Sequence, residues 1–250
     1  MNATPSPRRL VILPSYNSGP QLARTLAAVA AVWTPVWAVI DGSTDESGRL
    51  ARDLAIEGTR IIELATNSGK GGAVFEALKL ASAEGFDHAL VMDADGQHPP
   101  EAVAEFMALS EELPHCLIAG TPVFGPDAPG ERVTGRRVGN TLASIETLGR
   151  GARDSLFGFR VYPIAPVLRI LSGTRSARRF DFDTVVAVRL AWAGVPTVNR
   201  PVPVRYPPRE EGGVSHFHYV RDNLLLTRVH TGLLLEMWRH LPTLLSLPCH

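Results

Sequence analysis

The sequence predicts an α/β fold with a mostly parallel central sheet covered by helices on both faces. Short apolar runs alternate with longer amphipathic stretches, which is the pattern of repeated strand–helix units. Several apolar runs end in polar clusters, as strands that lead into a binding crevice do. With 250 residues, the chain is long enough for one such domain with a smaller appendage.

The expected elements follow from the spacing of the apolar positions. Strands are expected at residues 10–14, 37–40, 60–64, 87–92 and 116–119, and helices at residues 20–32, 71–84, 99–113 and 184–193. Another helix is expected after strand 37–40, because Ser43 and Glu46 have the spacing of a capping box. Residues 121–135 are rich in proline and glycine and are expected to form a mobile loop.

The cysteine content and the N-terminus favour a cytoplasmic protein. Cys116 and Cys249 are far apart and lack the spacing of metal ligands, so no disulfide framework is expected. Residues 1–9 lack the apolar stretch of a secretory signal. No apolar run approaches the roughly 20 residues that a membrane-spanning helix needs.

The formal net charge of zero hides an asymmetry between the two halves of the chain. Residues 1–129 contain 8 basic and 16 acidic side chains, whereas residues 130–250 contain 17 basic and 9 acidic ones. All 17 basic residues of the second half are arginines, which bind phosphate in a bidentate way. This distribution suits an anionic substrate or an anionic membrane surface, although solvated surface charge accounts for part of it. No nucleic acid partner is expected.

Residues 93–101 contain the most informative cluster of potential ligands. Asp93, Asp95 and Gln97 follow an apolar run at alternating positions, so an extended backbone points their side chains the same way. Such hard oxygen ligands in an incomplete shell suit Mg²⁺ or Mn²⁺. The alternative is a helix start, in which an Asp caps the helix that Pro99 and Pro100 open.

Two further observations point to a phosphate-bearing ligand. Polar clusters at residues 14–17, 41–45 and 93–97 each follow an expected strand, and the carboxyl ends of parallel strands meet at one edge of a sheet. Residues 67–73 open a helix, where free N–H groups and Lys70 favour an anion. Leu64 and Gly71 stand where a Walker A loop requires Gly and Ser or Thr, so that motif is excluded.

Together these segments resemble the family 2 glycosyltransferases, and most closely the dolichol-phosphate mannosyltransferase-like, or polyprenyl-phosphate glycosyltransferase, subgroup. The resemblance rests on residues 14–17, 41–45, 67–70 and 93–101, with residues 154–160, 180–183, 209 and 213–215 downstream. It implies a GT-A fold and an inverting, metal-dependent transfer from a UDP- or GDP-linked sugar. The expected catalytic domain is residues 1–206, with a nucleotide-sugar half at about 8–120 and an acceptor half at about 121–206. Residues 207–250 are expected to form a helical appendage.

The resemblance also implies roles for individual residues. Pro14 and Tyr16 would line the base pocket, and Asp41 would contact the nucleoside. The cation, Mg²⁺ or Mn²⁺, would be held by Asp93, Asp95 and Gln97, and Asp95 would belong to the catalytic residues. The expected substrate-binding residues are Pro14, Tyr16, Asn17, Asp41, Ser43, Lys70, Asp93, Arg136, Arg137, Asn140, Arg160 and Arg209.

The sequence departs from the subgroup on the acceptor side. Gly120 is followed by Thr-Pro where the subgroup has Ser-Arg, and that Arg helps to hold the acceptor phosphate. Arg136 and Arg137 match the second arginine region, with Asn140 where a Ser is common. The set of residues expected to bind an acceptor phosphate is therefore partly retained and partly missing.

Asp183 bears on the nature of the acceptor. A polyprenyl monophosphate is an anion at neutral pH and attacks without a general base, whereas a hydroxyl acceptor needs one. Asp183 is the best candidate base, and it is included among the expected catalytic residues. The alternatives are an anchor for an acceptor loop and the N-cap of the helix expected at residues 184–193.

Residues 217–247 are expected to form an amphipathic C-terminal helix with leucine triplets, Trp238 and three arginines. Such a helix suits a membrane interface, which would place the protein at the inner face of the cytoplasmic membrane. The alternatives are packing on the catalytic domain and contact with a second copy of the chain. His216 and His218 are expected to be packing or polar-cap residues.

Three functions remain open at this point. The first is transfer of a sugar to an anionic lipid acceptor, most of all a polyprenyl phosphate. The second keeps the donor chemistry but uses a hydroxyl acceptor, and the third is a nucleotide-sugar-binding module without catalysis. The intact Asp93, Asp95 and Gln97 argue against the third. A nucleotidyltransferase is disfavoured, because residues 14–17 lack its glycine-rich opening.

Overall fold

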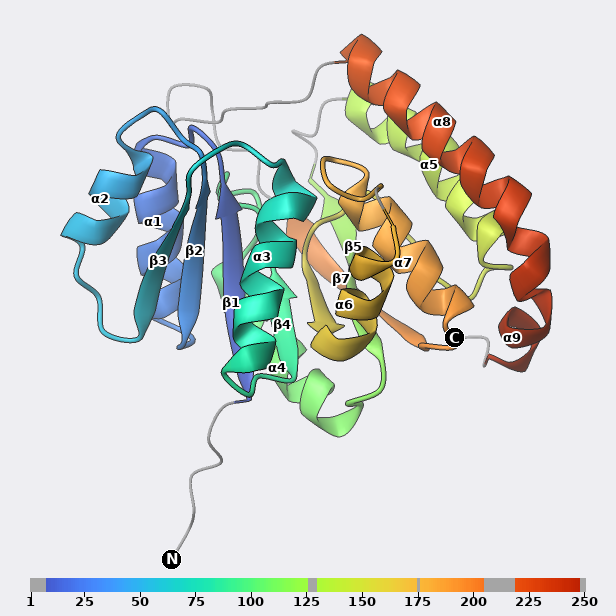
Figure 1. Ribbon diagram of the computed structural model, residues 1–250, viewed down its shortest axis with the longest axis horizontal. Helices are drawn as coiled ribbons and strands as arrows, with labels where there is room; N and C mark the ends of the chain where they lie inside the picture. The colour runs from blue at the N-terminus through green and yellow to red at the C-terminus, as the bar shows by residue number, and fades with distance from the viewer. Residues whose placement is uncertain (1–7, 126–129, 175, 205–218, 248–250) are drawn as a thin grey trace, which may run out of the picture.

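The computed structural model describes residues 8–125, 130–174, 176–204 and 219–247, and the side chains of residues 130–135 and 219–225 are not described. It contains a seven-stranded sheet with the order β3-β2-β1-β4-β6-β5-β7 (Figure 1). The strands are β1 (Arg9–Ser15), β2 (Val36–Asp41), β3 (Thr59–Leu64), β4 (His88–Val91), β5 (Leu117–Phe124), β6 (Arg160–Pro163) and β7 (Thr197–Val204). The five strands expected from the sequence are present, and β6 and β7 are additional.

Six of the strands run in one direction, and β6 runs against them. The pairs β1–β2, β2–β3, β1–β4 and β5–β7 are parallel. The pairs β4–β6 and β5–β6 are antiparallel. The predicted mostly parallel α/β sheet is therefore confirmed. Because β6 is reversed, the residues that precede it lie at the same edge as the carboxyl ends of its neighbours.

Helices cover both faces of the sheet. On one face, α3 (Lys70–Ala83), α6 (Ile164–Ser172) and α7 (Phe182–Trp192) share a buried apolar cluster with the strands. On the other face, α1 (Pro20–Ala30), α2 (Ser47–Asp53) and α4 (Val103–Glu112), which follows the short helix η1 (Pro100–Ala102), contribute to a second cluster. Figure 1 shows α3 and α6 in front of the sheet and α1 behind it.

A third layer of helices packs on α7. It consists of α5 (Gly130–Glu146), α8 (Tyr219–Met237), η3 (Trp238–His240) and α9 (Leu241–Ser246), and α5 and α8 lie side by side in Figure 1. Leu233 of α8 and Leu244 of α9 are buried against Trp192 of α7. Buried His230 of α8 contacts buried Glu146 of α5, with Nδ1 2.8 Å from Oε1. One face of the described C-terminal segment therefore packs on the domain.

The opposite side of α8 is exposed. The side chains of Leu235 and Trp238 are 71% and 63% accessible to solvent. Among the described helices, none combines the length and the apolar content that crossing a bilayer requires.

Three expectations about local structure are wrong. The loop expected at residues 121–135 is occupied at both ends, because β5 continues to Phe124 and α5 begins at Gly130. Beyond Ala119, β5 pairs only with β7 and is therefore an edge strand. An edge strand accommodates Pro122, because proline has no N–H group to donate to a second neighbour. The capping box at Ser43 does not form: α2 begins at Ser47, whose backbone N–H donates to Asp45 Oδ1 at 3.1 Å.

The third wrong expectation concerns the start of α7. The helix begins at Phe182 with Asp181 at the N-cap position, so Asp183 lies in the first turn and is not the cap. Asp181 instead stabilises the preceding loop by accepting hydrogen bonds from the backbone N–H groups of Ala177 (2.7 Å) and Arg179 (2.9 Å). The side chain of Asp183 is therefore available for a different contact.

The order of the strands reverses between β1 and β4. From β1 the chain moves outward to β2 and β3 and then returns to β4 on the other side of β1. At such a switch point, the loops after the two central strands diverge and leave room for a ligand. The polar clusters at residues 14–17 and 93–97 follow β1 and β4, so both lie at this position.

We predict that His88 makes the fold sensitive to acid. Its imidazole is buried at the start of β4, with Nε2 2.9 Å from the carbonyl oxygen of Pro114, and burial lowers its pKa below the ordinary 6.5. Below about pH 6.5 the unfolded chain binds a proton that the folded chain resists, so stability falls as the pH decreases. His88→Gln retains an N–H donor but does not titrate.

Urea unfolding at pH 7 and pH 5 checks this expectation. The variant should lose less unfolding free energy between the two pH values than the parent protein, even if its stability at pH 7 is lower. Equal losses in the two proteins would contradict the role of His88.

Candidate active site

The loops after β1 and β2 are joined by hydrogen bonds at the carboxyl edge of the sheet. The backbone N–H of Asn17 donates to Ser43 Oγ at 3.0 Å, and Asn17 Oδ1 accepts from the backbone N–H of Thr44 at 2.8 Å. Asn17 has a positive φ of 47°, which asparagine tolerates better than most residues. Pro14 is buried at the end of β1, and Tyr16 is 38% exposed beside it. Asn17 and Ser43, both predicted to bind substrate, hold these two loops together.

Asp41 fixes the turn that leads into α3. Its Oδ1 accepts hydrogen bonds from the backbone N–H and the hydroxyl of Ser68, both at 2.8 Å, and its Oδ2 accepts from the backbone N–H of Gly69 at 2.7 Å. Gly69 has a φ of 84°, a conformation that glycine adopts without strain. Asp41 therefore positions the N-terminus of α3, and its contact with a nucleoside stays a prediction.

Lys70, the first residue of α3, lies between two carboxylates from distant parts of the chain. Its Nζ is 2.7 Å from Asp93 Oδ1 and 2.6 Å from Asp183 Oδ2. Burial disfavours the ammonium, but attraction to Asp183 and Asp93 outweighs it and raises the Lys70 pKa above its ordinary value. Burial likewise opposes the charge of Asp93, and Lys70 more than compensates by lowering the Asp93 pKa. Lys70 and Asp93 are therefore both stabilised in their charged forms.

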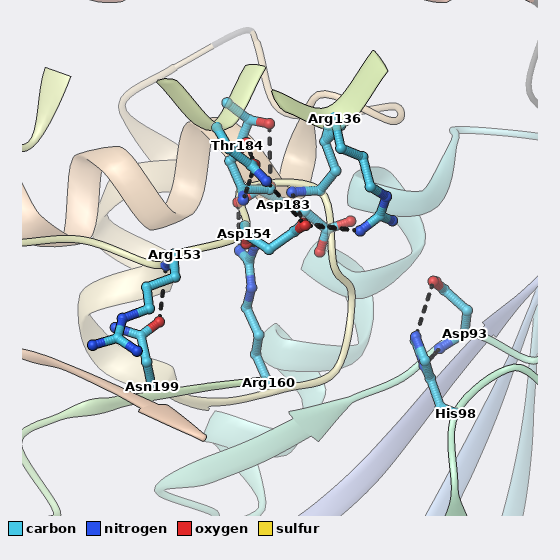
Figure 2. Close-up of polar contacts among 12 residues, drawn as sticks. Asp93, His98, Arg136, Arg153, Asp154, Arg160, Asp183, Thr184 and Asn199 are labelled. Carbon is cyan, nitrogen blue, oxygen red and sulfur yellow. Dashed lines mark hydrogen bonds and ion pairs between the residues drawn. The ribbon is translucent and has the colours of Figure 1, made fainter. Parts of the chain in front are cut away.

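His98 supports Asp93 from within the core. Its Nδ1 accepts a hydrogen bond from the backbone N–H of Asp93 at 3.1 Å, and its Nε2 lies 3.9 Å from Asp93 Oδ2 (Figure 2). Phe157 and Phe159 pack on the imidazole ring with centroid distances of 4.7 and 5.6 Å. Burial lowers the His98 pKa to about 4, so the ring is neutral at pH 7. A neutral His98 that accepts at Nδ1 presents its Nε2–H toward Asp93.

The predicted metal ligands lie on one short segment after β4. Asp93, Asp95 and Gln97 are partly exposed, and Asp95 Oδ1 accepts the backbone N–H of Gln97 at 3.0 Å. Two carboxylates and an amide oxygen are ligands that Mg²⁺ and Mn²⁺ prefer, and a substrate diphosphate completes such a shell. The described residues include no group of three or more His, Cys, Asp or Glu side chains that is suited to a metal. The binding of a metal by Asp93, Asp95 and Gln97 stays a prediction.

Arg136 and Asn140 of α5 converge on Asp154. Arg136 Nη1 is 3.0 Å from both carboxylate oxygens of Asp154, and Asn140 Nδ2 donates to Asp154 Oδ2 at 3.0 Å. Asn140 Oδ1 accepts from the backbone N–H of Ser155 at 2.9 Å. Figure 2 shows this cluster beside Asp183. Arg136 also contributes to lowering the pKa of Asp93, so its positive charge acts on the same site. Arg137, the next residue, is exposed.

Arg160 does not have the position that a substrate-binding residue needs. Its side chain is fully buried, and it donates to the backbone carbonyls of Asp183 (2.5 Å) and Asp154 (2.9 Å). The predicted contact of Arg160 with substrate is therefore wrong. Arg160 instead connects the loop of Asp154 to the start of α7 through hydrogen bonds in the interior of the protein. Arg209, the other predicted downstream arginine, lies outside the described residues.

Gly158 and Asp154 are parts of the site that sequence reasoning did not assign. A Cβ atom on Gly158 would lie 2.5 Å from Lys70 Nζ and 2.8 Å from Asp93 Oδ2, so any larger residue would displace this ion pair. Asp154 is buried and holds Arg136. Both residues belong to the segment 154–160, whose resemblance to the family was the available signal. Their contacts, however, depend on the reversed strand β6.

Comparison with known proteins establishes the class of protein to which this fold and site belong. Residues 10–181 match the family model "Glycosyl transferase family 2". The matched region is more than half of the chain and includes every site residue described above except Asp183. The chain therefore belongs to this family and is a family 2 glycosyltransferase.

Curated relatives narrow the resemblance further. The chain is 26% identical over 216 residues to a polyprenol monophosphomannose synthase of Mycolicibacterium smegmatis, covering 83% of this chain and 80% of the relative. It is 27% identical over 220 residues to an undecaprenyl-phosphate mannosyltransferase of Micrococcus luteus, covering 82% and 86%. These relatives support the subgroup expected from the sequence.

Solved structures confirm the GT-A fold. S. aureus TarS 1-349 in complex with UDP-GlcNAc superposes with a TM-score of 0.57 at 17% identity, covering 91% of this chain and 66% of that one. The UDP complex of the same protein gives a TM-score of 0.50 at 20% identity, covering 78% of this chain and 57% of that one. This chain thus spans somewhat less than two thirds of the length of those solved chains.

We predict that Gly158→Ala damages the site with little effect on the fold. The added methyl group would push Lys70 and Asp93 apart, and small displacements of reacting groups cost about 10- to 100-fold in rate. Transfer activity per folded molecule and the melting temperature are the measurements. Gly125→Ala is the matched control, because a Cβ there meets nothing within 4 Å. Equal activity in the two variants would contradict the predicted role.

Proposed function

We propose that this glycosyltransferase moves a sugar from a nucleotide-sugar donor to a polyprenyl phosphate, with inversion at the anomeric carbon and dependence on Mg²⁺ or Mn²⁺. The names of the two curated relatives support a polyprenyl-phosphate acceptor. The complexes of the structural neighbour with UDP-GlcNAc and UDP support a nucleotide-sugar donor. A UDP- or GDP-linked sugar is the donor class that we infer.

The contact of Lys70 with Asp183 is the observation that favours a phosphate acceptor. Asp183 is 4% exposed, and its Oδ2 is held by the ammonium of Lys70 at 2.6 Å. This oxygen is therefore occupied by Lys70 and is not open to the proton of an incoming hydroxyl. A hydroxyl acceptor would need this base, whereas a phosphate monoester already has the charge with which to attack.

The donor is proposed to lie in the crevice between β1 and β4. Pro14 and Tyr16 would contact the base, and the loops joined through Asn17, Ser43 and Asp41 would keep that pocket in shape. The proposed cation ligands are the carboxylates of Asp93 and Asp95 and the amide oxygen of Gln97. When bound, the dication would neutralise charge on the departing diphosphate. Lys70, fixed by Asp93 and Asp183, would supply a second positive charge at the same position.

The acceptor phosphate is proposed to approach from the side of α5. Among the described contacts, Arg136 uses only Nη1 for Asp154, so its other two nitrogens remain available to an anion. Asp154 and Asn140 would orient this guanidinium, which is the group best suited to a phosphate. Arg137 and Arg209 are the further arginines proposed for this contact.

Contact with the membrane is proposed for the exposed side of α8. A polyprenyl phosphate stays in the bilayer, so the enzyme must reach the membrane surface. Leu235 of α8 and Trp238 of the following η3 are exposed to solvent, and such a combination suits insertion at the lipid headgroup level. We propose a peripheral enzyme at the inner face of the cytoplasmic membrane.

The metal-dependent part of this proposal is tested by donor binding. Calorimetry with UDP- and GDP-linked hexoses should show binding that Mg²⁺ or Mn²⁺ strengthens and that chelation weakens. Asp95→Asn should reduce the metal-dependent binding by at least about tenfold, the lower range for altered metal surroundings. Asp53→Asn, a change of an exposed carboxylate on α2, is the control. Absence of binding for every donor in the presence of metal would refute the proposal.

A hydroxyl acceptor is the second candidate, and one observation favours it. In the described structure Asp183 Oδ1 is buried without a hydrogen-bond partner, so one oxygen is left to receive a proton. Asp183→Asn separates the two candidates, provided that the variant folds and binds donor, because its amide oxygen can still accept the Lys70 hydrogen bond but cannot take up a proton. With a phosphate acceptor we expect turnover within about threefold of the parent, whereas loss of an essential base costs about 10²- to 10⁴-fold. A loss of that size would reject the phosphate acceptor in favour of the hydroxyl.

A further inference from the structure

A second concave site lies between α7, α8 and the loop that precedes α7. It has a volume of about 470 Å³, and we call it the α7–α8 cleft. Its main lining residues are Arg178, Arg179, Val185, Arg189, Arg228 and Leu233. Both helices are seen together at the right of Figure 1.

The α7–α8 cleft is distinct from the site around Lys70. Asp181, Val185 and Arg189 line the cleft from α7, and their spacing of four residues places them along one face of the helix. Asp183, two residues from both Asp181 and Val185, therefore points to the opposite side, where it contacts Lys70. The two sites adjoin at Arg179, whose Cγ atom lies next to Gly69 at the start of α3. An anion between Arg228 and the α7 side of the cleft is nevertheless a different ligand from the proposed donor diphosphate.

The cleft has an excess of positive charge. Of its two acidic residues, Asp181 accepts two backbone N–H groups, and Glu236 pairs with Arg189 at 2.9 Å. Arg178 donates to the backbone carbonyl of Leu171 at 3.0 Å. Within the described residues, the guanidinium groups of Arg179 and Arg228 have neither a hydrogen-bond nor an ion-pair partner. Both side chains are exposed, so they are open to a ligand.

The rim of the cleft continues into an apolar surface. Leu235 follows Arg228 by seven residues and shares its side of α8, and Trp238 lies one turn further. Arg239 stacks over the Trp238 ring, with its guanidinium carbon 5.3 Å from the centroid. The exposed side of α8 and the start of η3 therefore present Leu235 and Trp238 beyond Arg228, at the rim of the cleft.

We infer that the α7–α8 cleft binds the phosphate headgroup of an anionic membrane phospholipid, while Leu235 and Trp238 enter the bilayer interface. Arg179 and Arg228 contact the phosphate, and Val185 and Leu233 contact the adjoining apolar part of the lipid. A membrane lipid fits better than a soluble phosphate, because the charged cleft opens beside exposed apolar side chains. This inference rests on the proposed membrane-bound acceptor and adds a lipid site that orients the enzyme on the surface.

Vesicle binding by the full-length protein tests the inference. The double variant Arg179→Gln, Arg228→Gln is compared with Arg169→Gln, Arg200→Gln, which removes two exposed arginines from α6 and β7 and gives the same net charge. Binding to phosphatidylglycerol-rich vesicles should fall roughly 30-fold in the first variant, as two surface arginines contribute about tenfold or less each. It should fall clearly less in the second variant. Binding to pure phosphatidylcholine vesicles should be weak and the same in all proteins.

Two controls keep the outcomes separate. Arg179→Lys, Arg228→Lys should retain most of the vesicle binding, which shows that charge in the cleft is responsible. Donor binding measured by calorimetry should be unchanged in every variant, so failure of the proposed function is detected independently. Equal losses in the two Gln variants would overturn the inference, because general attraction to the surface would then suffice. Inorganic phosphate that displaces the protein from vesicles at micromolar concentration would overturn it too, in favour of a soluble anion.

Discussion

The site depends on the ammonium of Lys70 being held between Asp93 and Asp183. Lys70, Asp93 and Asp183 come from the start of α3, the segment after β4 and the first turn of α7, so the contact joins three segments that are distant in the chain. Two carboxylates close together in a partly buried crevice would repel each other without this cation. The neighbouring features serve the same arrangement, because Asp41 positions the N-terminus of α3, His98 supports Asp93, and Gly158 leaves the space that the pair occupies.

The arginine-rich second half of the chain serves several purposes at once. Arg160 is buried inside the fold, where it donates hydrogen bonds to backbone carbonyls of two segments and so connects them. Arg136 is held in place by Asp154 and helps to lower the pKa of Asp93, whereas Arg179 and Arg228 face solvent. Net charge alone therefore says little about ligand binding, and the burial and partners of each guanidinium decide its role.

Sequence reasoning succeeded where the signal was local. Apolar runs and the polar residues that follow them are contiguous in the chain, so the first strands and the cluster at residues 93–97 were predictable. It failed where a distant partner decides the outcome. Pro122 is accepted in β5 because only β7 pairs with that part of the strand, and Ser43 bonds to Asn17 instead of capping α2. The bridging position of Lys70 likewise required residues 93 and 183 to be brought together by the sheet.

The reversed direction of β6 has a consequence for how such enzymes diversify. In the described sheet, the parallel strands present their final residues to the crevice, whereas β6 presents the residues that come before it. The loop with Asp154 and Gly158 thus enters the crevice as a separate insertion from the opposite half of the chain. Residues proposed for the sugar donor and those proposed for the acceptor therefore occupy different stretches of sequence. With the proposed roles, the Asp154 end of this loop would vary with the acceptor, whereas Gly158 would stay fixed by its contact with Lys70 and Asp93.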